Sequence, residues 1–165
     1  YDDTWDKSKF SYGVEMNPQY VNLVFNMHAE NIKPRLIKYS QRIKKFLHIQ
    51  RSLMPVRKPK NVRKLSYDEC WENILSMKPK SDKMIACAFT DWDNTPRHRM
   101  NGYVYEGVSP EKFKVYFSRL VEKVKKEYSS DMIFVFAWNE WSEGGYLEPD
   151  ELYKDGFLKA IKDSL

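Results

Sequence analysis

The sequence has few of the residues that build metal sites and disulfide frameworks. Its 165 residues include two cysteines, Cys70 and Cys87, and three histidines that are scattered along the chain. None of these side chains has the spacing of metal ligands, and two cysteines cannot form a disulfide framework. We therefore expect neither a metal nor an organic cofactor, and a reducing compartment such as the cytoplasm.

Long apolar runs and phosphate-binding motifs are also missing. No apolar segment approaches the roughly 18 residues of a membrane-spanning helix. The sequence contains neither a Walker lysine motif nor a GxGxxG motif, which cradle phosphate groups in nucleotide-binding proteins. These absences argue against a transmembrane protein and against a phosphate-binding loop.

Positive charge is confined to one segment. Of the 28 Lys and Arg residues, twelve lie in residues 33–64, which hold no Asp or Glu, so 16 basic and 23 acidic side chains remain elsewhere. The segment fits either a solvated helix face or an anionic partner. We expect no nucleic acid, because binding motifs are absent and the aromatic residues do not alternate with the lysines. An anionic membrane surface, or the diphosphate of a lipid-linked sugar, fits better and predicts peripheral contact with the inner membrane.

Residues 1–64 are interpreted as a lead-in. Residues 1–20 lack clear periodicity, and residues 21–27 fit a short strand or the start of a helix. A basic amphipathic helix is predicted at 34–50, followed by a Pro-containing linker at 51–64. We expect residues 65–165 to form the catalytic part, in one domain with residues 1–64.

The second part of the chain alternates between apolar strands and helices. Strands are predicted at 84–89 and 132–138, the latter buried on both faces, with a polar loop at 90–108 between them. Ser66 and Ser109 are predicted N-caps of helices, with Glu69 completing a capping box and Pro110 in a first turn. The helix after Ser109 is predicted to have an apolar face made of Phe113, Phe117, Leu120, Val121, Val124 and Tyr128. A terminal helix with Phe157, Leu158, Ile161 and Leu165 on one face follows. This order predicts an α/β fold made of parallel βαβα units.

Polar residues gather where both predicted strands end. Asp91, Asp93, Asn94 and Arg97 follow the first strand, and Asn139, Glu140 and Glu143 follow the second. Carboxyl ends of neighbouring parallel strands share one edge, so these groups can face each other across one cleft. A Glu pair near a helix start can also simply complement the helix dipole, and the aspartates can be turn residues. The tryptophans beside both clusters favour a functional site.

Two carboxyl groups among aromatic rings suit sugar chemistry. Cleavage of a glycosidic bond needs one carboxyl that donates a proton and a second that carries negative charge. Neighbouring carboxylates repel each other, which separates their pKa values and their roles. Aromatic faces stack on the C–H faces of sugars, and polar side chains bind the hydroxyls. Glu140 and Glu143 are therefore the candidate catalytic pair.

Several long motifs resemble one family. They are FTDWDNTPRHR (89–99), GVSPEKF (107–113) and FAWNEWSEGGYLEPD (136–150), followed by FLKAI (157–161). In this order they resemble the WbsX-like family, described as glycosyltransferases of bacterial polysaccharide biosynthesis and as similar to glycoside hydrolase family 99. The resemblance covers residues 65–165. It implies the carboxyl-terminal portion of a (β/α)8 TIM-type barrel, so the chain could be a barrel fragment, with both motifs on βα loops.

The resemblance also implies roles for individual residues. Glu143 would be the general acid/base, and Glu140 would assist from the sugar's 2-hydroxyl through an anhydro-sugar intermediate. The residues expected to bind an oligosaccharide or lipid-linked sugar are Trp92, Asp93, Asn94, Thr95, Arg97, Trp138, Asn139, Trp141 and Tyr146.

The sequence therefore predicts glycosyl transfer in the assembly of bacterial cell-surface polysaccharide, such as lipopolysaccharide, O-antigen or capsule. One alternative is a retaining, endo-mannosidase-like glycoside hydrolase that uses the same Glu pair. A second alternative, from another class, is a non-catalytic module that binds sugars without turning them over.

Overall fold

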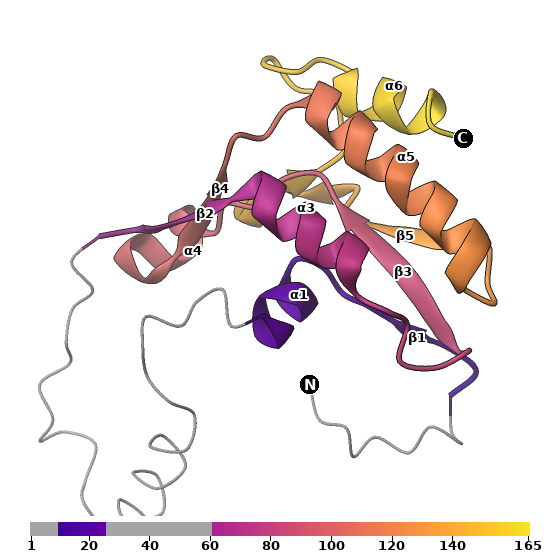
Figure 1. Cartoon of the computed structure of the whole chain (residues 1–165). Coiled ribbons are helices and arrows are strands. Elements are labelled where there is room, and N and C mark those ends of the chain that lie inside the picture. Colours follow the sequence, from indigo (N-terminus) through magenta and orange to yellow (C-terminus); the bar gives the residue numbers. More distant parts are fainter. Residues whose placement is uncertain (1–9, 26–60) are drawn as a thin grey trace, which may run out of the picture.

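A three-stranded parallel sheet lies at the centre of the computed structural model, which describes residues 10–25 and 61–165 (Figure 1). Its strand order is β1 (Gly13–Val14), β3 (Met84–Phe89), β5 (Ile133–Phe136). Ala86 pairs with Ile133, and Phe89 pairs with Phe136. Because β3 and β5 are parallel and in register, the segments that follow them leave the same edge of the sheet.

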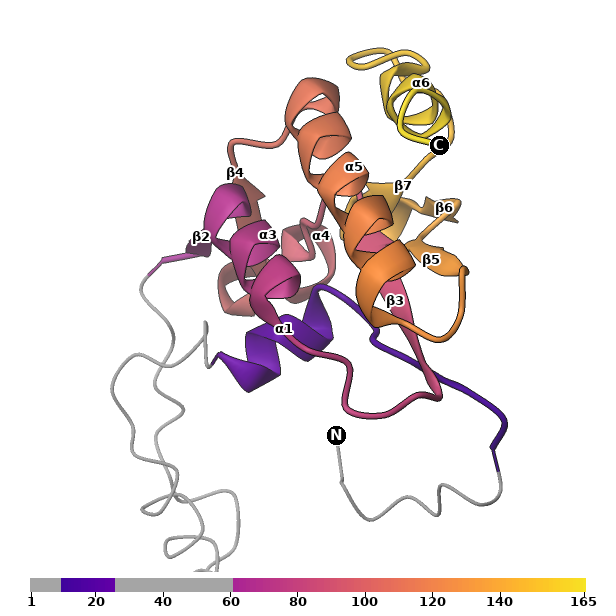
Figure 2. The ribbon, with the colours of Figure 1, turned by 45° about the vertical axis from the view of Figure 1, so that its right-hand side comes forward.

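Two long helices cover one face of this sheet. Helices α3 (Tyr67–Ser76) and α5 (Pro110–Glu127) lie side by side over β3 in both views, and α6 (Gly156–Lys162) packs on α5 (Figures 1 and 2). The short helix α1 (Gln19–Val24) contacts α3. No helix in the described ranges is long and apolar enough to cross a membrane.

A second parallel pair, β2 (Arg63–Ser66) and β4 (Tyr103–Glu106), sets the starting points of these helices. Strand β2 leads directly into α3, and β4 leads through a short turn into α5. Shorter elements lie in the loops after β3 and β5, namely α4 (Thr95–His98), η3 (Arg99–Asn101), β6 (Asn139–Glu140), η4 (Trp141–Glu143) and β7 (Gly145–Tyr146).

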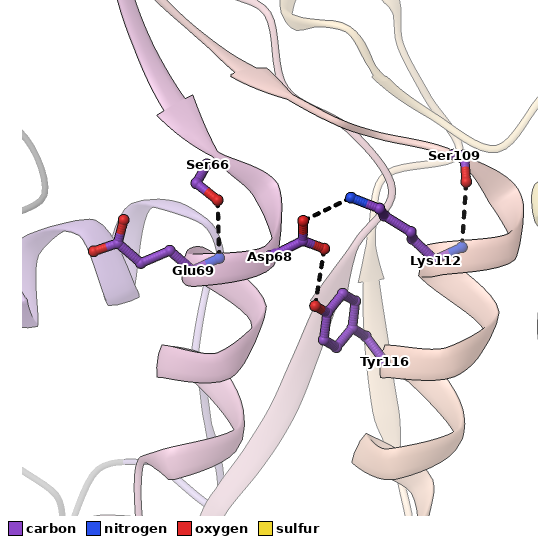
Figure 3. A network of polar contacts seen from close by, with 6 residues as sticks. All are labelled: Ser66, Asp68, Glu69, Ser109, Lys112 and Tyr116. Carbon is purple, nitrogen blue, oxygen red and sulfur yellow. Dashed lines mark hydrogen bonds and ion pairs between the residues drawn. The ribbon is translucent and has the colours of Figure 1, made fainter.

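Polar contacts join the first turns of α3 and α5 (Figure 3). The Asp68 carboxylate accepts hydrogen bonds from Lys112 Nζ at 2.6 Å and from the Tyr116 hydroxyl at 2.9 Å. Ser66 and Ser109 cap the two helices through their side chains, which accept from backbone N–H groups at 3.2 and 3.3 Å. The caps satisfy N–H groups that have no partner inside a helix, so both helices begin at defined residues.

Aromatic packing forms the core between these layers. Trp71 is fully buried, and its ring lies parallel to the rings of Phe89 (5.6 Å between centroids) and Tyr116 (5.7 Å). Trp71 thus joins α3 to the sheet and to α5. Burial of such large apolar side chains supplies most of the favourable free energy of folding.

Residues 10–25 belong to this same core. Asn17 Nδ2 donates to the Cys87 carbonyl at 2.8 Å, and Asn22 Oδ1 accepts from the Tyr105 hydroxyl at 2.6 Å. These side chains are buried, so loss of either contact would leave an unpaired polar group inside the protein.

The structure confirms several predicted elements. The strand at 84–89, both serine caps and the Pro110 start of α5 are found as predicted. The predicted apolar face of α5 is buried at Phe113, Phe117, Leu120, Val121 and Val124. The chain is thus a mixed α/β structure with parallel strands.

Other predictions are wrong in detail. The strand at 132–138 is shorter, and it is not buried on both faces, because Phe134 is 50% exposed and β5 is an edge strand of the described sheet. The polar loop at 90–108 contains α4, η3 and β4. Residues 13–14, in the predicted irregular lead-in, form β1 by pairing with β3. No local sequence pattern predicts this strand.

The terminal helix and the start of β2 also differ in part from the prediction. Helix α6 buries Phe157 and Ala160, whereas Leu165 is exposed. The predicted linker ends earlier than residue 64, since Arg63 and Lys64 pair in β2. The predicted basic helix at 34–50 lies outside the described residues, as does nearly all of the segment expected to contact a membrane.

We expect Leu120→Ala to lower the free energy of unfolding by about 2–5 kcal/mol, because it removes buried methyl groups and leaves a cavity. Leu120 is 1% exposed in the middle of α5. The matched control is Val115→Ala on the same helix, where the side chain is 58% exposed. Urea denaturation of both variants checks this, and equal losses in the two would contradict the described packing of α5.

Candidate active site

Thr90, the residue that follows β3, forms hydrogen bonds with α3 and β7. The Thr90 carbonyl accepts a hydrogen bond from the Tyr67 hydroxyl at 2.9 Å. Its Oγ1 donates to the Tyr146 carbonyl at 3.0 Å. Thr90 is fully buried, so these contacts fix where the first loop begins relative to α3 and β7.

Side chains of the first loop accept hydrogen bonds from backbone N–H groups of the same loop. Asp93 Oδ1 accepts from Thr95 N at 2.8 Å, and Asn94 Oδ1 accepts from Tyr103 N at 2.8 Å. Asp and Asn side chains commonly close turns in this way. The turn fixes the start of α4, which carries Arg97.

The second loop is a small hairpin. Strands β6 and β7 are antiparallel, with Glu140 opposite Gly145, and the 3-10 helix η4 joins them. The turn closes at Gly144, whose φ of 66° lies in the left-handed region that glycine adopts most readily. The hairpin brings Glu140 and Glu143 to one short stretch of backbone.

The two loops are in direct contact. Asp93 N donates to the Glu143 carbonyl at 2.8 Å. A Cβ on Gly144 would lie 2.9 Å from Asp93 N, closer than a side chain can come. Arg97 NH1 also forms an ion pair with Glu143 Oε1 at 2.8 Å. The shared sheet edge thus brings Asp93, Arg97 and Glu143 together, in contact rather than across an open cleft.

The two glutamates have different surroundings. The Glu143 side chain is 14% exposed and lies against the Arg97 guanidinium. Glu140 accepts a hydrogen bond from the Ser142 hydroxyl and has a neutral partner there. A carboxylate held by a cation and another held by a hydroxyl can take different parts in one reaction.

Aromatic side chains border the second loop. Trp138 and Trp141 are 55% and 48% exposed, and Tyr146 stacks on Trp141 with 3.8 Å between ring centroids. Exposed indoles beside carboxyl groups form the kind of surface that sugar rings bind.

Two predicted binding residues lie deeper. Trp92 is 2% exposed and packs between Tyr103 (5.9 Å) and Phe136 (5.4 Å), and Asn94 is buried in its turn. Both side chains contribute to the packing of the first loop. Their contact with a ligand stays a prediction.

Asp91 is a further carboxyl at this edge. It is half-buried, and its Oδ1 accepts from Trp92 N at 2.6 Å. Burial raises the pKa of Asp91 from 3.8 to about 6, and the nearby Asp93 charge adds to the rise against the hydrogen bond from Trp92. The sequence placed Asp91 at this edge and suggested nothing of its burial.

Asp91→Asn is expected to stabilise the protein at pH 7 more than at pH 4. Between about pH 4 and pH 6 the unfolded chain loses the Asp91 proton while the folded chain keeps it, so the wild type loses stability as the pH rises. The difference in unfolding free energy between variant and wild type should grow by about 2–3 kcal/mol over this window. Urea denaturation at both pH values measures it. A difference that stays constant, or that the exposed control Asp82→Asn reproduces, would contradict the burial of Asp91.

The hydrogen-bond acceptors of Trp141 and Tyr146 were not predicted from the sequence. Trp141 Nε1 donates to Glu148 Oε2 at 2.6 Å, and the Tyr146 hydroxyl donates to Asp150 Oδ2 at 2.9 Å. Both carboxylates lie in the quoted motif at 136–150, but their spacing alone does not indicate which ring each one meets. Within the described ranges, no three His, Cys, Asp or Glu side chains are placed to hold a metal ion.

The chain belongs to a family of carbohydrate-active proteins. Residues 3–161 match the family described as Glycosyltransferase WbsX, which covers almost the whole chain and includes both loops. The match also covers residues 3–64, which lie outside the motifs quoted above.

Two curated relatives are similar to part of the chain. Both are named uncharacterized protein WxcX, from strains B100 and ATCC 33913 of Xanthomonas campestris pv. campestris, and both are 36% identical over 76 residues. The aligned segment is 45% of this chain and 11% of each relative. No solved structure matches the chain.

Proposed function

We propose that this chain carries the glycosyl-transfer site of an enzyme that assembles bacterial cell-surface polysaccharide. Glu143 supports this proposal most strongly. It lies where the loops after two neighbouring parallel strands meet, against Arg97 at 2.8 Å, with its backbone bonded to Asp93. Active sites of parallel α/β folds form at this edge. The description of the family as glycosyltransferases supports the same class of reaction.

Glu140 and Glu143 would act in turn on the sugar. Glu140 takes the proton of the 2-hydroxyl as that oxygen attacks C1, and Glu143 protonates the oxygen that leaves C1. The hydroxyl of an acceptor then attacks C1, Glu143 receives its proton, and Glu140 returns a proton to the 2-oxygen. Both steps invert C1, so the anomeric configuration is retained. The two glutamates have different partners, a guanidinium and a hydroxyl, so the two carboxyl groups are not equivalent.

The surrounding residues would bind the sugar substrate. Arg97 fixes the orientation of Glu143 and, being 59% exposed, also reaches ligand. Sugar hydroxyls would meet Asp93, Thr95 and Asn139 on the two loops, and ring faces would meet aromatic side chains of the second loop. Those aromatic side chains are Trp138, Trp141 and Tyr146.

We further propose that the βαβα unit is part of a (β/α)8 barrel whose active site is at the carboxyl ends of the strands. Three parallel strands in the order β1-β3-β5, with α3 and α5 on one face, support this topology. The position of β5 at the edge of the described sheet is also consistent, because a barrel supplies a further strand there. Residues 65–165 would be its catalytic part, and residues 1–64 would share the domain.

Glu143→Gln and Glu140→Gln are each expected to lower turnover of oligosaccharide by about 10²–10⁴-fold, because the amide can neither give nor take the proton. Mannose-type and mixed oligosaccharides are the probes, and Glu151→Gln, a change of an exposed carboxylate nearby, is the matched control. The assay is run on this chain and on a version extended upstream.

The products decide between the candidate functions. An elongated glycan supports transfer, and a free sugar would show hydrolysis by the same pair. Binding without turnover, unaffected by either glutamine variant, would overturn the enzymatic proposal in favour of a sugar-binding module.

A further inference from the structure

The Trp141 ring has one covered face and one open face. Tyr146 covers the first face, with 3.8 Å between centroids and 16° between ring planes. Trp141 is nevertheless 48% exposed. Since one face is stacked on Tyr146, the ring surface left to a ligand is the opposite face and the edge, which makes the pair a candidate apolar platform.

The polar atoms of both rings are already occupied. The indole has one donor, and Trp141 Nε1 gives it to Glu148 Oε2 at 2.6 Å. The Tyr146 hydroxyl gives its proton to Asp150 Oδ2 at 2.9 Å. A ligand on the platform would thus meet an apolar face, and the two carboxylates limit rotation of the rings about their side-chain bonds.

Hydrogen bonds hold the backbone of both Glu148 and Asp150 in place. Glu148 N donates to the Trp138 carbonyl at 3.1 Å. Asp150 exchanges two backbone hydrogen bonds with Lys154, at 3.2 and 3.1 Å, and its Oδ1 accepts from Tyr153 N. Burial opposes ionisation of Asp150, but the hydrogen bonds from Tyr153 N and the Tyr146 hydroxyl outweigh it and lower its pKa. The ring acceptors therefore have defined positions, and Asp150 is an anion at neutral pH.

We propose that Glu148 and Asp150 are positioning residues for a carbohydrate subsite, in which the open face of Trp141 binds the C–H face of an uncharged pyranose next to Glu140 and Glu143. Trp141 lies between the two glutamates in sequence and begins η4, which joins β6 to β7. Aromatic faces stack on apolar C–H groups. The carboxylates around the platform disfavour a uronic acid through like-charge repulsion. The inference rests on the proposed function only in taking a sugar as the ligand.

The test uses the full chain with its tryptophans labelled with 15N, so that the Trp141 indole N–H signal reports the hydrogen bond to Glu148 without any ligand. Glu148→Leu removes the acceptor, Glu148→Gln retains one, and Tyr146→Phe keeps the stack but removes the bond to Asp150. Glu151→Leu is the matched control on an exposed carboxylate of the same loop. Neutral mannose-type oligosaccharides and oligouronates are the two ligand probes.

We expect Glu148→Leu to shift the Trp141 indole signal and to weaken binding of the neutral oligosaccharide by roughly 3- to 10-fold, the range of one lost hydrogen bond. Tyr146→Phe should weaken it by a smaller factor. Glu148→Gln and Glu151→Leu should leave both readouts near wild type. Where the protein turns over, KM should rise with little change in kcat, because the chemistry of Glu140 and Glu143 is untouched.

Three results would overturn the inference. A Trp141 signal and an affinity that Glu148→Leu does not change would remove the positioning role. A signal that moves in Glu148→Leu but responds to no neutral sugar would remove the carbohydrate subsite. Oligouronate binding as tight as neutral-sugar binding would remove the stated ligand class. Sugar binding at Trp141 without any turnover would instead support this inference and count against the glycosyl-transfer proposal alone.

Discussion

The close approach of two loops at Gly144 is the constraint on which the candidate site depends. The Asp93 N–H reaches the Glu143 carbonyl at 2.8 Å only because residue 144 has no side chain and adopts a positive φ. Together with the hydrogen bond from Thr90 Oγ1 to the Tyr146 carbonyl, this contact sets how closely the loops after β3 and β5 approach. The ion pair between Arg97 and Glu143 follows from it, since an exposed guanidinium gains little from a pair that the backbone does not preorganise.

The rest of the fold brings these loops to one place. Parallel register between β3 and β5 sends both loops from the same sheet edge, and the β2–β4 pair starts α3 and α5 next to each other. Trp71 packs against both the sheet and α5, so the layer behind the site is joined by buried aromatic contacts. Flexible hydrogen-bonding groups on a rigid scaffold are a common arrangement for binding sites. Here the strands and helices form the scaffold, and the loops after β3 and β5 carry the candidate side chains.

Local sequence signals predicted the elements that local chemistry determines. The serine caps at 66 and 109, the apolar strand at 84–89 and the buried stripe of α5 were all found, because each depends on neighbouring residues. Strands β1, β2 and β4 form by pairing with distant segments, and no local pattern predicted them. In the candidate site, too, some features could be predicted from the sequence and others could not. The meeting of Glu143 with Arg97 came from topology, whereas the burial of Asp91 and the ring partners Glu148 and Asp150 required three-dimensional coordinates.

Amide hydrogen exchange at Asp93, followed by NMR, tests most directly whether the two loops form one preassembled site. The Asp93 N–H should exchange slowly in the wild type, because the Glu143 carbonyl protects it, and Gly144→Ala should speed its exchange. The amides of α5 should stay protected in both proteins. Exchange of Asp93 as fast as that of an exposed loop amide in the wild type would contradict the account, since the two loops would then lie apart and the glutamates would lack their neighbours.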